Sequence, residues 1–406
     1  MPNRMRLAVF TDTYAPQVNG VARTLGRLTE SFRERGGDAT VVTVEAGEHG
    51  TVHAGHAGGK RERLAEDVLR WPAIPFWAYP ELRIATPRVS EARRLLRELK
   101  PDLVHAATPF GIGLAAREAA RAEGIPLVSS FHTDFAAYLR HYNLQALSAV
   151  AWPYLRWFHN GGARTFVPTA RGAEDLRRRG FDGVRVWGRG VDGARFSPRY
   201  RSRALRSAHG VRDHDLLFIS VGRLASEKGI DRILAAAHSL LPLGGGRIRL
   251  ALVGDGPAES RYRASAPPGT IFTGRLLGDA LSEFYASADG FVFASTTDTF
   301  GNVLLEAMAS GLPVIAPDSG PTLDVANEGN ALVVPVRDPQ ALAGAMQRLA
   351  GDAALRMKLR VRSLQSAAER DWKRVWDDLF AEYAAVLEAR PLVSPAAPAR
   401  AIITAL

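Results

Sequence analysis

The chain has 406 residues, of which 46% are hydrophobic and 23% charged, so it is long enough for two globular domains. It contains no Cys, which excludes disulfides and thiolate chemistry, and no apolar run reaches the length of a transmembrane helix. The net charge is +10, and residues 1–190 hold 27 Lys and Arg against 19 Asp and Glu.

The basic first half favours an anionic membrane surface as a partner, because no nucleic-acid-binding motif is present. Solvated, Arg-rich faces are the alternative interpretation of the same composition. The N-terminal residues MPNRMRLAVF lead directly into a strand and leave no room for a secretory signal. We therefore expect a cytoplasmic protein, peripheral on the inner face of the cell membrane.

Strand and helix patterns alternate from the N-terminus, which predicts a parallel α/β sheet. A strand over residues 6–11 leads into the loop DTYAPQVNG and then a helix over residues 21–35. Gly20 stands at the N-terminus of that helix, where either a bound phosphate or a plain strand-to-helix turn is compatible with the sequence. The polar side chains of this loop suit an acceptor or donor hydroxyl, and they are Tyr14, Gln17 and Asn19.

Two segments of the first half lack a periodic pattern. Residues 46–63 contain His49, His53 and His56, but no carboxylate or Cys completes a metal-ligand set, so we expect a mobile surface loop and no metal site. Residues 71–87 contain too many prolines for a regular element, and we expect an ordered loop or a strand edge there.

His132 follows a buried strand, at whose carboxyl end a ligand-facing side chain is expected; a core or capping histidine is the alternative. The next segment, residues 138–160, interleaves aromatic and basic residues at helical spacing. This pattern suits an interfacial surface, but a helix that packs between domains explains it slightly better.

The regular alternation stops at residues 189–200, which we interpret as an interdomain linker. A second alternating unit follows, and an amphipathic helix over residues 371–389 is expected to cross back to the first domain. The predicted boundaries are residues 1–190 and 191–372 for two Rossmann-like domains, 373–389 for the crossover helix and 390–406 for a flexible tail.

Residues 291–317 have the pattern of a strand, a loop, a helix and a strand. The amides of residues 300–302 should lie at the N-terminus of that helix and at the carboxyl end of a parallel strand, where α/β sheets bind anions. Asp298 and Glu306 stand on either side, where one carboxylate suits sugar hydroxyls and the other ribose hydroxyls. The alternatives are that Asp298 caps the helix and that Glu306 is a solvated helix residue.

Seven motifs occur in order along the chain: FTDTYAPQVNGVARTL, SFHTDF, GRGVDGARFSP, VGRLASEKGID, LVGDGP, FTGRL and TDTFGNVLLEAMASGLPVI. With them, residues 5–387 resemble the retaining GT-B glycosyltransferases of the family 4 (group 1) type. The chain is most similar to the bacterial members that glycosylate membrane lipids, the α-mannosyltransferases and α-glucosyltransferases. The resemblance implies an α/β fold of two Rossmann-like domains that face each other across a donor-binding cleft.

The resemblance also assigns the site residue by residue. Arg223 and Lys228 match the pair that holds the donor pyrophosphate and stabilises the leaving nucleoside diphosphate, the alternative being two surface charges. Asp298 stands where the family has the first Glu of its E-x7-E signature and is one methylene shorter, and Glu306 matches the residue that holds the ribose. The implied catalytic set is Arg223, Lys228, His132 and Asp298. The implied donor-binding set is Gly20, Arg223, Lys228, Gly254, Arg275, Asp298, Phe300, Gly301, Asn302, Val303 and Glu306.

The activity that the resemblance implies is retaining transfer of a hexose from a nucleotide sugar to an acceptor hydroxyl without a metal cofactor. Mannose from GDP-mannose and a lipid headgroup or glycan acceptor are favoured. The alternative is a UDP-glucose-dependent diacylglycerol or polysaccharide α-glucosyltransferase, and a non-catalytic basic membrane-binding protein of the same fold is a further one. The one Asp-x-Asp match, residues 213–215, is expected to be a solvated loop.

Three rival classes are compatible with parts of the sequence. A dinucleotide oxidoreductase would use the glycines of residues 254–260, but these form only a broken G-x-G-x-x-G motif. A phosphorylase or a nucleotide-sugar epimerase would share the fold, the first turning over with free phosphate and the second needing no acceptor.

Overall fold

The computed structural model describes residues 5–17, 19–45, 68–76, 79–132, 145–240 and 247–389. The chain divides into two compact units. The first unit takes residues 1–130, 158–165 and 379–406, and the second takes residues 131–157 and 166–378. The predicted boundary at residues 190 and 191 stays a prediction.

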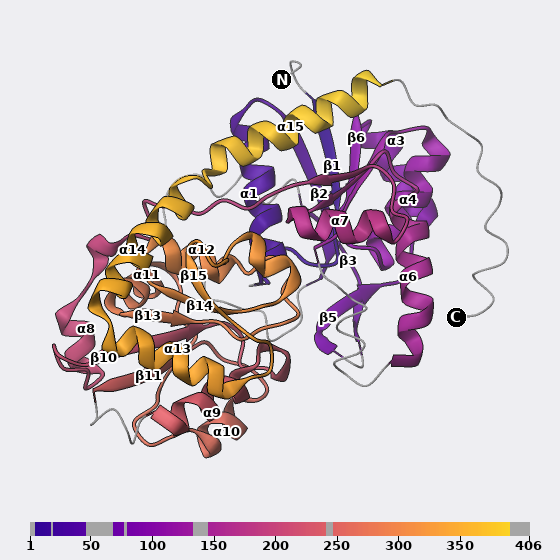
Figure 1. The fold of residues 1–406 in the computed structure, drawn as a ribbon. Helices are drawn as coiled ribbons and strands as arrows, with labels where there is room; N and C mark the ends of the chain where they lie inside the picture. Colours follow the sequence, from indigo (N-terminus) through magenta and orange to yellow (C-terminus); the bar gives the residue numbers. More distant parts are fainter. Residues whose placement is uncertain are drawn as a thin grey trace. The chain divides into compact units, whose positions relative to one another are not determined.

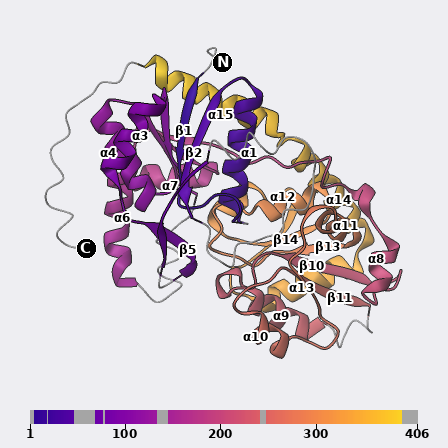
Figure 2. The ribbon, with the colours of Figure 1, turned by 180° about the vertical axis from the view of Figure 1, so that it is seen from behind.

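The first parallel sheet has seven strands in the order β3-β2-β1-β6-β7-β8-β9 (Figure 1). Its strands are β1 (Arg6–Phe10), β2 (Asp38–Val44), β3 (Val68–Trp71), β6 (Leu103–Ala106), β7 (Leu127–Ser130), β8 (Arg164–Val167) and β9 (Val184–Val186). The helices of this part of the chain are α1 (Gly20–Glu34), α3 (Val89–Leu99), α4 (Gly111–Glu123), α6 (Gln145–His159) and α7 (Ala170–Arg178). Helix α1 lies beside β1 and β2 in both views (Figure 2).

The second parallel sheet has six strands in the order β12-β11-β10-β13-β14-β15. Its strands are β10 (Leu216–Val221), β11 (Ile248–Val253), β12 (Ile271–Gly274), β13 (Gly290–Val292), β14 (Val314–Pro317) and β15 (Ala331–Val334). The helices of this part are α8 (Arg203–Ala208), α9 (Ile230–Leu240), α10 (Glu259–Ser265), α11 (Gly278–Ser287), α12 (Asn302–Ala309), α13 (Pro339–Gly351), α14 (Ala353–Ala368) and α15 (Trp372–Glu388).

Each sheet reverses its winding direction once. Numbered along the chain within each sheet, the second sheet runs 3-2-1-4-5-6, as in dinucleotide-binding folds, and the first has the same order with a seventh strand added at its end. In such sheets a ligand binds at the carboxyl ends of the two strands where the order reverses. These switch points lie between β1 and β6 in the first sheet and between β10 and β13 in the second.

The second sheet is buried on both faces, which explains its continuous apolar strands. Leu217 and Ile219 of β10 pack with residues of α11 and α12, whereas Phe218 between them packs with α9 and α13. Successive side chains of a strand point to opposite faces, so each face requires its own apolar set. The helices accordingly cover the sheet from both sides (Figure 1).

Helix α15 was predicted over residues 371–389 and is found at Trp372–Glu388. Trp376 is buried, and its ring lies 6.2 Å from that of Trp187 in the second unit. In the first unit, Tyr383 is buried and its hydroxyl lies 2.6 Å from His105 Nδ1. The Phe380 ring lies 5.4 Å from that of Phe32 of α1.

Of the two expectations for residues 71–87, an ordered loop or a strand edge, the structure shows edge strands, so only the expectation that prolines exclude a regular element is wrong. Ala73–Phe76 (β4) and Tyr79–Ala85 (β5) form a two-stranded antiparallel sheet in which Pro75 pairs with Arg83. Each strand of an isolated pair has one unpaired edge. A proline is tolerated at such an edge, because the N–H that it lacks would have no partner strand there.

One side of the described part of the aromatic and basic segment packs in the core, while Val150, Pro153 and Arg156 are exposed. Leu155 and Phe158 of α6 are buried, and the Trp152 ring stacks on Phe131 with a centroid distance of 6.2 Å. This favours domain packing over an interfacial surface for these residues, while residues 133–144 lie outside the described ranges. None of the helices that the structure describes has both the length and the apolar character to span a membrane.

Candidate functional site

The loop after β10 is held tightly against the end of β13. Gly222 has φ +156° and Gly229 has φ +68°, values that favour glycine. A Cβ on Gly229 would lie 2.5 Å from the Ala294 carbonyl oxygen, so only glycine allows this approach. The close packing brings Lys228, the residue before Gly229, to the loop that follows β13.

Lys228 and Asp298 form an ion pair at the switch point of the second sheet. The Lys228 Nζ lies 2.9 Å and 3.0 Å from the two carboxylate oxygens of Asp298, and the two side chains are 21% and 24% exposed. Burial alone would raise the pKa of Asp298, but the Lys228 ammonium and a hydrogen bond from Ser295 outweigh it and hold that pKa below its ordinary value. Asp298 is therefore an anion at neutral pH.

Asp298 does not cap helix α12, so that alternative is wrong. The N-cap residue is Gly301, with φ +82°, and no side chain caps the first turn. Asn302 and Val303 begin the helix, and Phe300 before it is buried. The amides at this N-terminus lie at the carboxyl end of the sheet, as the sequence predicted, where they favour an anion.

Arg223 is paired with a residue that sequence reasoning missed. Its Nη2 forms an ion pair with Oε1 of Glu227, whose side chain is fully buried. A buried carboxylate needs such a partner, and the pair orients the guanidinium of Arg223. Their spacing of four residues was visible in the sequence, but nothing there distinguished Glu227 from a surface acid.

Glu306 is buried in α12, so it is not the solvated helix residue of the alternative interpretation. Its Oε2 accepts a hydrogen bond of 3.0 Å from the buried hydroxyl of Tyr285 on α11. The role of Glu306 toward a ribose stays a prediction.

Three strand ends meet at the glycines of the second sheet. A Cβ on Gly254, after β11, would lie 2.0 Å from the Gly222 carbonyl oxygen after β10. The Gly254 amide donates to the Gly274 carbonyl of β12 at 2.9 Å. Next to them, Arg275 and Asp255 form a half-exposed ion pair of 3.0 Å. Gly254 and Arg275 therefore lie near the base of the loop that carries Arg223.

His132 is joined to the same loop region of the second unit. Its carbonyl oxygen accepts a hydrogen bond of 2.6 Å from Thr299 Oγ1, the residue after Asp298. Its Nδ1 lies 2.9 Å from Nη2 of Arg189, and its ring lies 5.4 Å from that of Trp187. Arg189 was not predicted, because residues 189–200 were interpreted only as a linker. Thr299 lies within residues 291–317, where only Asp298, Glu306 and the helix N-terminus were assigned roles.

The three acceptor candidates have partners inside the first unit. The buried Tyr14 hydroxyl lies 2.7 Å from Thr29 Oγ1, so this side chain serves the core. Thr13 Oγ1 donates to Gln17 Oε1 at 2.6 Å and accepts from Asn19 Nδ2 at 2.7 Å. Asn19 also caps α1, where its Oδ1 accepts from a first-turn amide at 2.8 Å. Their acceptor role stays a prediction.

At the switch point of the first sheet, Asp12 after β1 is bonded to Thr108 after β6. Thr108 Oγ1 donates to Asp12 Oδ2 at 2.6 Å and accepts from the Asp12 amide at 2.9 Å. Burial raises the pKa of Asp12 from 3.8 to about 6, although the bond from Thr108 opposes the shift. Gly20, the predicted phosphate contact, is the first residue of α1 in the same unit.

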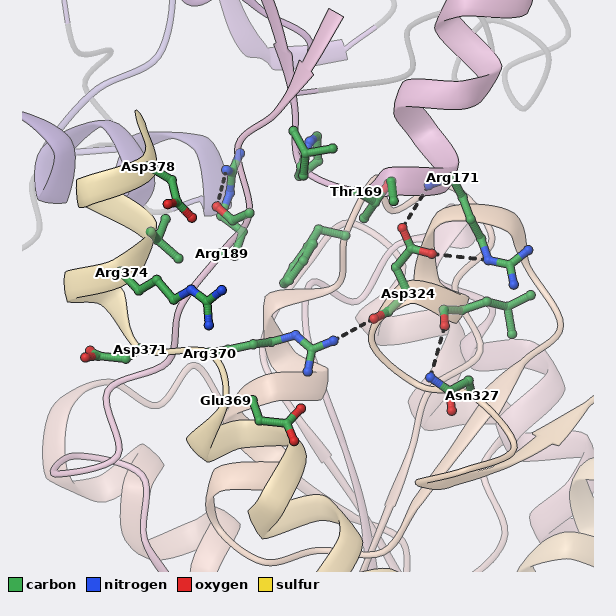
Figure 3. A pocket seen from close by; sticks show the side chains of 17 residues that line it. Thr169, Arg171, Arg189, Asp324, Asn327, Glu369, Arg370, Asp371, Arg374 and Asp378 are labelled. Atoms are coloured by element: carbon green, nitrogen blue, oxygen red, sulfur yellow. Dashed lines mark hydrogen bonds and ion pairs between the residues drawn. The ribbon is translucent and has the colours of Figure 1, made fainter. Parts of the chain in front are cut away.

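A pocket of about 590 Å³ opens in the second unit. Its wall carries charges of both signs, including Arg189, Arg374 and Asp378 (Figure 3). Arg171 and Asp324, also in the wall, form an ion pair of 3.2 Å. Phe300 is the one residue of the predicted donor-binding set among its lining residues.

The expectation of a solvated Asp-x-Asp loop at residues 213–215 is wrong for Asp215. This side chain is fully buried and forms ion pairs with Arg212 and Arg249. Burial alone would raise the pKa of Asp215, but the hydrogen bonds from Arg212 and the charge of that residue lower it. The motif is therefore structural.

In the parts of the chain that are described, no three His, Cys, Asp or Glu side chains cluster as metal ligands would. His49, His53 and His56 lie outside the described residues.

Two sheets of Rossmann strand order, with cations, carboxylates and helix amides gathered at one switch point, define a nucleotide-binding type of α/β protein. Family models match both halves of the chain: "Glycosyltransferase Family 4" over residues 18–195 and "Glycosyl transferases group 1" over residues 215–352. A GDP-mannose-dependent alpha-mannosyltransferase of Corynebacterium glutamicum is 33% identical over 384 residues, which is 94% of this chain and 89% of that protein.

A second relative is an alpha-monoglucosyldiacylglycerol synthase of Streptococcus pneumoniae, 29% identical over 77% of this chain and 71% of that protein. Among solved structures, Anabaena HepE in complex with UDP and glucose superposes with a TM-score of 0.73. It is 21% identical and covers 94% of this chain and 100% of that chain, so it supports the fold. The chain belongs to the family 4, group 1 glycosyltransferases, and it is an enzyme with the GT-B fold.

Proposed function

We propose that the protein transfers a hexose from a nucleotide sugar to an acceptor hydroxyl with retention of configuration, and that the donor is GDP-mannose. The Corynebacterium relative, which is described as GDP-mannose-dependent and covers most of the chain, supports this choice. UDP-glucose is the second candidate, because the streptococcal relative is a glucosyl transferase and the Anabaena structure holds UDP and glucose.

The observation that carries the proposal is the group of charges at the switch point between β10 and β13. Arg223 and Lys228 come from the loop after β10, and the uncapped N-terminus of α12 comes from the loop after β13. Two cations and a set of amides suit a diphosphate, which accumulates charge as the bond to the sugar breaks. Arg223 and Lys228 would then stabilise the leaving nucleoside diphosphate.

The carboxylates fit the two sugars of such a donor. Asp298 is an anion with acceptor capacity beyond its bonds to Lys228, and it would accept from hydroxyls of the hexose. Glu306, in helix α12 after that loop, would hold the ribose. Gly254 and Arg275 would lie toward the base and phosphates. His132 would contact the hexose beside Asp298, to whose loop it is bonded through Thr299.

The two cations and the helix amides support a reaction without a metal ion. The leaving diphosphate would be compensated by Arg223, Lys228 and the amides of Asn302 and Val303. The acceptor hydroxyl would attack from the face that the diphosphate leaves, with the departing phosphate as its base. No side chain of the chain is needed as a nucleophile.

The acceptor would be a lipid headgroup or a glycan, bound by the first unit through the loop of Tyr14, Gln17 and Asn19. The excess of Lys and Arg over Asp and Glu in residues 1–190 supports peripheral attachment to an anionic membrane, at its cytoplasmic face. The lipid acceptor of the streptococcal relative supports the same class.

Product analysis tests the proposal. The purified chain is incubated with GDP-mannose or UDP-glucose and with vesicles that contain phosphatidylinositol or diacylglycerol, in the presence of EDTA. We expect an α-linked hexosyl lipid from GDP-mannose, and transfer from UDP-glucose alone would select the second candidate. Turnover that requires an added divalent cation would contradict the metal-independent mechanism, and turnover of neither donor would contradict the proposed function.

A further inference from the structure

The bond between Arg189 and His132 determines where the proton of the imidazole lies. Nη2 of Arg189 lies 2.9 Å from Nδ1 of His132. A guanidinium has only N–H donors and no acceptor, so Nδ1 must accept this bond with its lone pair. The single proton of the neutral ring is then on Nε2, which becomes the donor that His132 offers.

Arg189 cannot easily turn away from this bond. Its Nη1 donates to the carbonyl oxygens of Trp187 at 2.7 Å and Gly188 at 2.9 Å, and its guanidinium carbon lies 4.6 Å from the centroid of the Trp187 ring. The side chain is 5% exposed, and it lies in the wall of the pocket described above (Figure 3). Three interactions with one neighbouring segment thus hold the guanidinium in place.

The positive charge of Arg189 is not cancelled locally. Burial lowers the pKa of Arg189 to about 9, so the group is still a cation at neutral pH. No carboxylate of the described residues forms an ion pair with it. A cation at hydrogen-bond distance disfavours a second positive charge on the imidazole. Charge and hydrogen bonding therefore select the same state, a neutral ring with the proton on Nε2.

We propose that Arg189 is a positioning residue that holds His132 as a neutral Nε2–H donor toward an oxygen of the bound hexose. The proposal rests on the proposed function, because only that function places a hexose near His132. The backbone of His132 is hydrogen-bonded to Thr299, next to Asp298, the residue proposed to bind the hexose. His132 is then a hydrogen-bond donor in the reaction and not a general base. Arg189 acts through His132 and contacts neither the donor nor the acceptor.

Nitrogen NMR on the full chain with ¹⁵N-labelled histidine tests this directly, since the two neutral tautomers give different patterns of two-bond N–H couplings. His132→Gln assigns the resonances. We expect wild type to show the Nε2–H tautomer alone. Arg189→Met, which removes the donor, should lose that preference, and Arg189→Lys, which keeps a cationic donor, should restore it. Arg374→Met is the matched control, because Arg374 lines the same pocket and is exposed, and it should leave the His132 signals unchanged.

Kinetics provide the functional readout. In Arg189→Met we expect kcat for hexose transfer to fall about 10- to 100-fold, as for other residues that orient a catalytic side chain, with the Kd for the nucleoside diphosphate unchanged and with recovery in Arg189→Lys. An Nδ1–H tautomer in wild type would overturn the proposal even if Arg189→Met does not fold. Unchanged kcat in a folded Arg189→Met would overturn it as well. If wild type transfers no hexose, the proposed function fails, while the NMR result still decides the tautomer.

Discussion

The Nζ of Lys228 lies 2.9 Å and 3.0 Å from the two carboxylate oxygens of Asp298, which connects the loop after β10 to the loop after β13. The family pattern assigns these two side chains to different parts of the donor, the diphosphate and the hexose. Because they also bind each other, a diphosphate that binds Lys228 must do so next to the negative charge of Asp298.

Replacing Asp298 by Asn should therefore strengthen nucleotide binding while it slows transfer. The change removes a carboxylate that repels the diphosphate, and we expect GDP to bind roughly three- to tenfold more tightly. The kcat should fall, because the hexose loses a charged acceptor for its hydroxyls. Calorimetric titration and initial rates measure the two effects.

Asp377→Asn is the matched control for this experiment. It breaks another Lys–Asp pair, Lys373 Nζ to Asp377 Oδ2 at 3.0 Å, on the exposed surface of α15 and changes the net charge equally. Neither GDP affinity nor kcat should change in it. Weaker GDP binding in Asp298→Asn would show that Asp298 does not face the diphosphate.

Removing Arg223 should affect stability as well as function. Arg223→Met leaves the buried carboxylate of Glu227 without this ion pair, which is expected to lower the free energy of unfolding by about 3–5 kcal/mol. The double change Arg223→Met with Glu227→Gln should regain most of this stability, because the buried charge is gone. It should not regain GDP affinity. Denaturant unfolding and titration separate the two roles, and recovery of GDP binding in the double variant would contradict the assignment of Arg223.

Gly254→Ala tests the packing beneath the Arg223 loop. A Cβ there would lie 2.0 Å from the Gly222 carbonyl oxygen, and the residue has φ +139°, so the substitution forces the loop to move. We expect a loss of about 3 kcal/mol or more in unfolding free energy, together with weaker GDP binding. Gly344→Ala in α13, where a Cβ would meet nothing within 4 Å, should instead raise the unfolding free energy by about 0.4–1 kcal/mol. Equal effects of the two changes would refute the packing argument.

Asp12 should make the protein less stable as the pH rises. Its pKa is about 6 when folded and 3.8 ordinarily, so between these values the folded chain binds more protons than the unfolded one. The contribution of protonated Asp12 is complete below pH 3.8 and is lost as the pH rises through about 6, an effect of about 3 kcal/mol. Asp12→Asn cannot ionise, so its unfolding free energy relative to wild type should rise by most of that amount from pH 4 to pH 7. A difference that stays constant with pH would contradict the shifted pKa.

The regular elements of the site were predictable because each has a local signal. The helix expected within residues 291–317 is found at Asn302–Ala309, and Gly311 after it has φ +74°. The position of its amides followed from the rule that parallel strands end at one edge of the sheet. Apolar runs, helix formers and a terminal glycine suffice for such a prediction.

The pairing of side chains was not predictable, because it depends on contacts between loops distant in sequence. Lys228 and Asp298 are separated by 70 residues, and only the close approach of Gly229 to Ala294 brings them together. Glu227 and Arg189 are buried charges in segments whose composition resembles that of surface loops. The bond of the Tyr14 hydroxyl to Thr29 was not predictable either, because a loop has no periodic pattern that shows which side chains point inward.

The most direct test of the donor site is calorimetric titration of the full chain with GDP and with UDP in the presence of EDTA. We predict micromolar binding of GDP, weaker binding of UDP, and at least tenfold loss of GDP affinity in Lys228→Ala and in the stabilised Arg223→Met, Glu227→Gln double variant. Binding that is unchanged in both variants would place the nucleotide elsewhere. If neither nucleotide binds at millimolar concentration, the site between β10 and β13 is not a donor site.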